Sequence, residues 1–197
     1  MKQIVISIFG SILIISCKPK SEFKTIDFVE FEITVPRQWN ELKFKGIDSY
    51  VGGIITPEKD SLIFDIGRYS SDITEEDFVI IYDKRRYNEL NENEKKLLKK
   101  ENYLIIDSIS QEVDREKYRR QKFVVEKVDC FQAKFITPRK SGLGVTGIYI
   151  DSLRGNSKDF TKVRMCFYGY NLKQRTQQQF VNALRTIKFK EYCYSEK

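Results

Sequence analysis

The stretch Lys122–Thr137, KFVVEKVDCFQAKFIT, decides the fold. Apolar and polar side chains alternate after its central pair, Asp129 and Cys130, and an apolar run over residues 123–125 precedes the pair. This period of two is typical of half-buried strands, so the stretch predicts an antiparallel hairpin of residues 122–128 and 131–137. A two-residue turn prefers glycine in second place, so Cys130 there is locally costly or the loop is longer. The predicted core side chains of the second strand are Phe131, Ala133 and Phe135, with Gln132 and Lys134 facing water.

Outside this hairpin, the same kind of pattern predicts further strands. They cover residues 28–35, 49–56, 62–69, 146–152 and 162–168, with a short closing strand at 187–190. Pro36 ends the first of them, and Trp39 is expected to fold back over the core as a lid. Gly52 and Gly53 lie inside the second strand, where glycine indicates a bulge or the close approach of another backbone.

Capping boxes mark two helices. Asn91-x-x-Glu94 predicts a middle helix over residues 92–102. Thr176-x-x-Gln179 predicts a C-terminal helix that ends at Arg185. The expected buried side chains are Leu97 and Leu98 in the first helix, and Phe180, Ala183 and Leu184 in the second. Residues 78–82 fit either a strand or a helical turn, 103–109 are expected to be extended, and 111–121 fit a short helix or a loop.

Together these elements predict a single α+β domain over residues 28–190. Its antiparallel sheet is packed by the middle helix and the C-terminal helix, and residues 191–197 form a tail. A hydrophobic content of 41% is enough for one core in a chain of this length.

The first twenty residues, MKQIVISIFGSILIISCKPK, have the features of an export signal. Lys2 precedes an apolar run over residues 4–15, which is shorter than the ~20 apolar residues of a membrane-spanning helix. Ile14-Ile15-Ser16-Cys17 resembles the lipobox of bacterial lipoproteins. The resemblance implies residues 1–16 as a signal peptide, cleavage between Ser16 and Cys17, a diacylated Cys17 as the membrane anchor, and a tether over residues 17–27.

Charge is unevenly distributed along the chain. Residues 18–83 hold 8 basic and 14 acidic side chains, whereas residues 84–197 hold 26 and 14, within a total net charge of +7. A basic half often indicates nucleic acid, but an export signal removes that partner. The expected partners are the membrane through Cys17 and either another envelope protein or an anionic surface. The tether lacks the acidic run that marks surface export in some lipoproteins, so the domain is expected to face the periplasm. The expected location is the outer membrane rather than the inner membrane.

The sequence contains no histidine, which excludes Ser-His-Asp and Cys-His catalysis and histidine-ligated metals. Its cysteines form no C-x-x-C motif. With Cys17 assigned to lipid, Cys130, Cys166 and Cys193 allow one disulfide with three pairings, or remain as small buried side chains. No cofactor or metal is expected.

Two further parts of the chain resemble a known fold family. Phe31-x-Ile33-x-Val35-Pro36-x-x-Trp39 near the start and residues 180–189 near the end are similar to the PsbP-like family. The resemblance implies an antiparallel sheet sandwiched between helices, and an accessory or assembly role at a membrane. It carries over no functional residue.

The strongest candidate site is a loop for anions. Arg139 and Lys140 precede Gly142 and Gly144, so cations and glycine amides combine at one tip, although a solvated loop explains the same residues. Residues 142–147 match G-x-G-x-x-G by letter, but a strand follows where the dinucleotide motif needs a helix. Seven carboxylates lack the spacing of a calcium-binding loop: Asp48, Asp60, Asp65, Asp72, Glu75, Glu76 and Asp77. Four tyrosines fit either an aromatic platform or ordinary strand positions: Tyr168, Tyr170, Tyr192 and Tyr194.

These observations favour binding over catalysis. The sequence predicts a membrane-anchored envelope lipoprotein that acts as a binding or assembly module. One alternative is a histidine-free hydrolase that works through two carboxylates. A further alternative is a purely structural lipoprotein without a specific ligand.

Overall fold

The computed structural model describes residues 21–74, 80–98, 103–107, 113–158, 160–191 and 193. The expected signal peptide, the lipobox and Cys17 lie outside the described residues, as do Glu75, Glu76, Asp77, Tyr192 and Tyr194. The described chain is α+β, and antiparallel strands dominate it. No helix in this part of the chain is long and apolar enough to cross a membrane.

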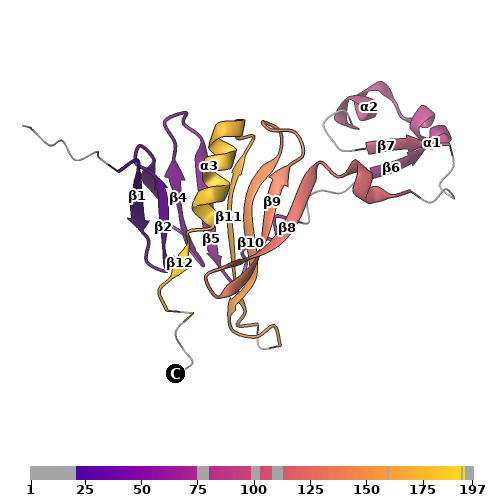
Figure 1. Ribbon diagram of the computed structural model, residues 1–197. Coiled ribbons are helices and arrows are strands. Elements are labelled where there is room, and N and C mark those ends of the chain that lie inside the picture. Colours follow the sequence, from indigo (N-terminus) through magenta and orange to yellow (C-terminus); the bar gives the residue numbers. More distant parts are fainter. Residues whose placement is uncertain are drawn as a thin grey trace, which may run out of the picture.

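A seven-stranded antiparallel sheet forms the centre of the molecule (Figure 1). In spatial order its strands are β3 (Asn40–Lys43), β4 (Tyr50–Ile55), β5 (Ser61–Gly67), β11 (Val163–Tyr170), β10 (Val145–Arg154), β9 (Phe131–Pro138) and β8 (Gln121–Val128). The alternation of apolar side chains predicted all of these strands except β3. That strand has the sequence NELK, which carries one apolar residue and therefore no period-two signal.

The hairpin of β8 and β9 is confirmed, with a two-residue turn. Val128 pairs with Phe131, and Asp129 between them has a φ of 55°. Asp129 and Cys130 occupy this turn because both side chains contact the C-terminal segment. The Asp129 carboxylate accepts the backbone N–H of Phe189 at 2.9 Å, and Cys130 forms a disulfide with Cys193.

A second layer covers one face of the large sheet (Figure 1). It consists of a three-stranded sheet, β1 (Phe23–Asp27), β2 (Phe31–Pro36) and β12 (Lys188–Phe189), and of helix α3 (Gln174–Leu184). β1 lies within the tether predicted for residues 17–27, because its five residues pair with β2 from Phe23↔Pro36 to Asp27↔Glu32. Residues 23–27, which the sequence placed in the tether, are therefore part of the folded domain.

The main core lies between these two layers. Edge-to-face aromatic contacts connect them: the ring centroids of Phe31 and Phe64 are 5.1 Å apart, and those of Phe167 and Phe180 are 5.1 Å apart. Trp39 is 1% exposed and belongs to this core, which confirms that it packs against the core. A smaller apolar cluster lies on the other face of the large sheet and contains Ile73, Ile136, Val145, Tyr149 and Cys166.

Of the two roles expected for Gly52 and Gly53, the close approach of another backbone is confirmed at Gly53, where a Cβ atom would lie 2.5 Å from the carbonyl oxygen of Leu62, whereas Gly52 faces a side chain. The register of β4 on β5 is continuous from Tyr50 to Ile55, so there is no bulge. A Cβ atom at Gly52 would lie 2.4 Å from Cζ of Phe64. The Phe64 ring, which is fully buried, occupies the space that a side chain at position 52 would need.

Helix α3 confirms the predicted apolar face and corrects its start. Phe180, Ala183 and Leu184 are buried against the core. The N-cap residue is Lys173, with no side-chain capping bond, and Thr176 is 2% exposed inside the helix. Burial against the core, rather than a capping box, fixes where Thr176 lies.

The middle of the chain forms a small lobe beside β8 (Figure 1). It contains β6 (Ile80–Asp83), α1 (Lys84–Glu89), α2 (Glu92–Leu98) and β7 (Tyr103–Ile106), and β6 and β7 are parallel. A 3₁₀ turn, Arg115–Tyr118, leads back to β8. The prediction that the middle helix packs on the sheet was wrong: in Figure 1, α2 lies in this lobe, away from the large sheet.

The lobe nevertheless confirms the first capping box. The Asn91 backbone N–H donates to Glu94 Oε2 at 2.8 Å, and the Glu94 N–H donates to Asn91 Oδ1 at 3.0 Å. Leu98 is buried as expected, but Leu97 is 65% exposed. A helix of seven residues presents too narrow an apolar face to bury both.

Candidate functional site

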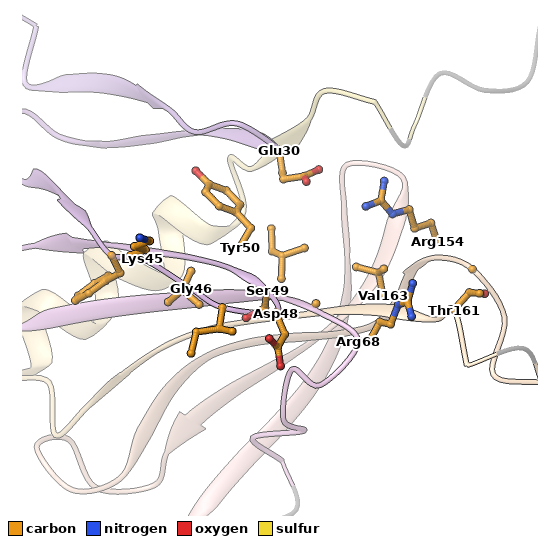
Figure 2. Close-up of a pocket in the computed structure, with 16 residues that line it drawn as sticks. Glu30, Lys45, Gly46, Asp48, Ser49, Tyr50, Arg68, Arg154, Thr161 and Val163 are labelled. Carbon is orange, nitrogen blue, oxygen red and sulfur yellow. The ribbon is translucent and has the colours of Figure 1, made fainter.

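A hollow lies at the end of the large sheet where β5 and β10 end, here called the distal pocket (Figure 2). Its volume is about 840 Å³. Four segments far apart in sequence form it: the β1–β2 turn, the β3–β4 connection, the end of β5 and the β10–β11 connection. The lining residues are Glu30, Phe44, Lys45, Gly46, Ile47, Asp48, Ser49, Tyr50, Val51, Ile66, Gly67, Arg68, Arg154, Gly155, Thr161 and Val163.

The β10–β11 connection closes tightly beside the pocket. Gly155 has a φ of 79°, and a Cβ atom there would lie 2.2 Å from the carbonyl oxygen of Thr161. Only glycine fits this position, because the region of positive φ and the contact both exclude a side chain. The tight closure holds Arg154 and Thr161 on the same rim of the pocket.

Charged side chains stand around an apolar floor. Figure 2 shows Arg68 and Arg154 on one side, near Val163, and Lys45 on the other. The two carboxylates of the pocket, Glu30 and Asp48, lie on opposite sides in this view and do not converge. The arrangement therefore offers charges of both signs for recognition, but not two carboxylates aimed at one bond.

Apolar side chains also face solvent in the pocket. Ile47 is fully exposed, at 100%, and Phe44 is 47% exposed. Tyr50 contributes a polar end, since its hydroxyl accepts the backbone N–H of Val29 at 3.2 Å. Exposed apolar side chains surrounded by charges are characteristic of protein-binding surfaces.

An ion cluster on the other face of the sheet supports the same rim. Asp151 contacts the Lys162 ammonium, lies 3.7 Å from Arg164 Nε, and accepts the Tyr149 hydroxyl at 3.1 Å. Arg164 Nη1 in turn donates to the carbonyl oxygen of Arg68 at 3.0 Å. The cluster thus fixes the backbone from which Arg68 enters the pocket.

The charges of this cluster shift its titration. The hydrogen bond from Lys162 holds the pKa of Asp151 below its ordinary value, against the opposing effect of burial. Burial and the neighbouring Asp151 charge raise the pKa of Tyr149 well above its usual range. Asp151 is therefore an anion and Tyr149 a neutral hydroxyl at neutral pH, and neither is poised for proton transfer.

Cys166 is the free cysteine among the described residues, and it is buried. Burial raises the pKa of its thiol to about 12, with the Asp65 charge as a second cause. The thiolate is the reactive form of cysteine, so Cys166 is not a nucleophile at neutral pH. Of the three pairings that the sequence left open, the structure has Cys130–Cys193, with the Cα atoms 5.6 Å apart.

The loop predicted to bind anions lies at the opposite end of the sheet from the distal pocket. Arg139 and Lys140 are exposed there, and Gly142 and Gly144 have positive φ. The Gly142 amide donates to the carbonyl oxygen of Leu172 at 3.0 Å. The Gly144 amide donates to Asn171 Oδ1 at 2.8 Å. Both glycine amides therefore bond within the protein, and of the predicted anion-binding groups the side chains of Arg139 and Lys140 face solvent.

The other candidates are dispersed. Among the described residues, no three acidic or cysteine side chains form a cluster that fits a metal ion. Asp48 lines the distal pocket, Asp60 bonds Thr56 in the β4–β5 turn, and Asp65 accepts the Ser70 hydroxyl at 3.0 Å. Asp72 accepts the amide of Thr74. Tyr168 and Tyr170 contact edge to face at 5.3 Å, and strand β10 follows the G-x-G-x-x-G letters as expected.

Sequence reasoning missed the distal pocket. Arg68 and Arg154 are 86 positions apart, and only the pairing of β5, β11 and β10 brings them to one rim. One local signal was available: Ile47 is an isolated apolar residue within the polar stretch Lys45–Ser49. No family model matches this chain, and no curated protein matches its sequence.

Proposed function

We propose that this protein is a lipid-anchored envelope protein that binds another envelope protein through its distal pocket. The observation that carries the proposal is the open pocket of about 840 Å³ with an exposed apolar centre and charges of both signs. Ile47 is the expected anchor of the contact, because a fully exposed aliphatic side chain gains most from being covered.

The position of the pocket supports this function. β1 begins at Phe23 at the end of the molecule opposite the pocket, where Phe23 pairs with Pro36 (Figure 1). The turn after β1 brings Glu30 to the pocket. A chain anchored at Cys17 thus presents the pocket away from its anchor, toward other molecules of the envelope.

Two finer statements belong to the same proposal. The resemblance to the PsbP-like family suggests an accessory or assembly role, and the covered face of the antiparallel sheet is compatible with such a sandwich. The resemblance to a lipobox and the absence of an acidic run in the tether favour a membrane-anchored domain that faces the periplasm, and the proposed location is the outer membrane rather than the inner membrane.

The test is site-specific photocrosslinking in intact cells. A photoreactive residue at position 47 is expected to give a discrete adduct with one envelope protein. The same residue at position 125 is the control, since Val125 is 64% exposed on β8, far from the pocket. The charge reversals Arg68→Glu and Arg154→Glu should each reduce the adduct at least about fivefold, the effect of losing one buried charge contact.

Position 47 giving no adduct beyond that of position 125 would contradict binding through the pocket. The anchor has its own control: Cys17→Ser should move the protein out of the membrane fraction. Continued membrane association of that variant would refute lipidation and leave the pocket result standing.

A further inference from the structure

We propose that the end of the domain opposite the distal pocket docks on the surface of an anionic phospholipid bilayer. This proximal end is formed by residues 21–23, 36–38, 139–144 and 171–175. The inference rests on the lipid anchor of the proposed function, and it adds an orientation and a second binding surface to it.

The tether leaves the domain at this end. Ser21 is the first described residue, and four peptide links separate it from Cys17, which span at most about 14 Å. Arg37 Nε donates to the carbonyl oxygen of Ser21 at 2.6 Å, so the chain exit is fixed to the domain. A lipidated Cys17 therefore holds the proximal end within a short distance of the lipid headgroups.

Two arginines meet in a hollow at the exit. The hollow has a volume of about 520 Å³ and is lined by Ser21, Glu22, Phe23, Pro36, Arg37, Gln38, Arg175 and Gln179. Arg37 comes from the β2–β3 turn and Arg175 from the first turn of α3. Guanidinium groups bind phosphate with two parallel hydrogen bonds, so this pair suits the phosphate of a lipid headgroup.

The loop 139–144 extends the same surface. It is fixed to the segment before α3 by the Gly142 amide on Leu172 and by the Asn171 amide on the carbonyl oxygen of Gly144, at 3.0 and 2.8 Å. Residues 138–145 and 170–179 contain no acidic side chain. These four segments carry five exposed cations and one acidic residue, Glu22, while Glu58 and Asp60 lie in the β4–β5 turn at the same end of the sheet. The cations are Arg37, Arg139, Lys140, Lys173 and Arg175.

An apolar residue stands at the tip of this basic surface. Leu143 is 59% exposed between Gly142 and Gly144. Burying an exposed leucine in the interfacial region of a bilayer is favourable, and cations around it attract anionic headgroups. Each cation near such a surface increases binding about fivefold, and the tether raises the effective concentration of the surface. Weak individual contacts are therefore sufficient for docking.

The test uses the full lipoprotein, purified from membranes and reconstituted in vesicles that contain brominated phospholipids. Leu143→Trp introduces a tryptophan at the loop tip, while the native Trp39 is 1% exposed and serves as a shielded background. Phe160→Trp is the matched control, because Phe160 is 85% exposed in the connection beside the distal pocket. In vesicles with anionic lipid, bromine should quench the tryptophan at position 143 at least about twofold and leave that at position 160 unchanged.

The electrostatic part has its own readout. Quenching at position 143 should fall by at least about half from 0.1 M to 1 M salt, as the Debye length drops from about 10 Å to about 3 Å. The same loss is expected for Arg37→Gln combined with Arg175→Gln, and for vesicles of zwitterionic lipid alone.

Protein that floats with the vesicles but shows equal quenching at positions 143 and 160 would overturn the docking and leave the anchor intact. Emission at position 143 that is shifted to the blue yet insensitive to bromine would mean that a second copy covers this end, which also overturns it. Protein that does not float at all would refute the anchor and the docking together.

Discussion

Asp129 shows how one residue serves both local and tertiary structure. Its φ of 55° turns the β8–β9 hairpin, a conformation that aspartate tolerates. Its carboxylate accepts the Phe189 amide and lies 3.6 Å from the Lys188 ammonium. The turn therefore holds β12 in place, which explains why glycine is absent from a turn that locally favours it.

Asp151 carries the pH-dependent prediction at the residue scale. Its pKa is lowered in the folded protein, chiefly by the hydrogen bond from Lys162. A lowered pKa means that this ion cluster stabilises the fold above the unfolded pKa of about 3.9, and that the contribution is lost as pH falls through the folded value. Its side chain is 65% exposed, so the contribution is expected to stay below about 1 kcal/mol.

The measurement is the melting temperature of Asp151→Asn and of the native protein between about pH 7 and pH 2. The variant should melt lower at neutral pH, and the difference should vanish as the pH falls through the lowered pKa of Asp151. Lys162→Ala is the matched control, since it should raise the pKa of Asp151 toward its ordinary value. A constant difference at all pH values would contradict the assignment.

Helix α3 is held by two contacts of different strength. Phe180 and Leu184 are fully buried in the main core. Arg185, at the C-cap, forms a two-pronged ion pair with Glu126 on β8, with Nε–Oε2 at 2.7 Å and Nη2–Oε1 at 2.8 Å. This hydrogen-bonded pair lowers the pKa of Glu126 and raises that of Arg185. The core contact dominates, since a buried phenylalanine contributes about 3–5 kcal/mol.

The element-scale prediction concerns that ion pair. A double-mutant cycle of Arg185→Ala and Glu126→Ala should give a coupling of about 1 kcal/mol in urea unfolding, at the upper end for partly exposed pairs. Arg185→Lys should retain less than half of it, because an ammonium cannot form both bonds. The matched comparison is Phe180→Ala, with a loss of about 3–5 kcal/mol. Zero coupling would show that α3 is positioned by its apolar face alone.

At the scale of the whole molecule, the disulfide between Cys130 and Cys193 connects two segments that are distant in sequence. It joins the β8–β9 turn to the segment after β12, across a sequence separation of 63. The three-stranded sheet holds the first strand of the fold, β1, and its last, β12, on either side of β2. The disulfide therefore fixes the C-terminal segment to both layers.

We expect Cys130→Ser combined with Cys193→Ser to lower the free energy of unfolding by about 4 kcal/mol, from the loop-closure entropy of 63 residues. Urea unfolding of the oxidised and reduced native protein is the control, and reduction should cause the same loss. The Cys166 thiol is buried and should remain unmodified by alkylating agents in both folded forms. A loss below about 1 kcal/mol would mean that β12 is held by Asp129 and packing alone.

The sequence by itself determined most of the elements. Local apolar patterns gave the hairpin, β2, β4, β5, β10 and β11. Period-two alternation is clear in β2 and β5, whereas β10 is buried on both faces from Val145 to Ile150. Spacing of three and four gave the apolar face of α3, and the Asn91–Glu94 capping box gave the start of α2. The resemblance of residues 14–17 to a lipobox and the absence of histidine are likewise read from the sequence alone.

Only the tertiary structure decided the rest. β1, β3 and the lobe depend on partners distant in sequence, so no local pattern predicts where they pack. The disulfide pairing was one of three equal choices until the C-terminal segment met the β8–β9 turn. The distal pocket and the basic proximal end arise because antiparallel pairing carries the two ends of every strand to opposite ends of one sheet. Ile47 and Arg154 meet at one of these ends, and Arg37 and Arg175 at the other.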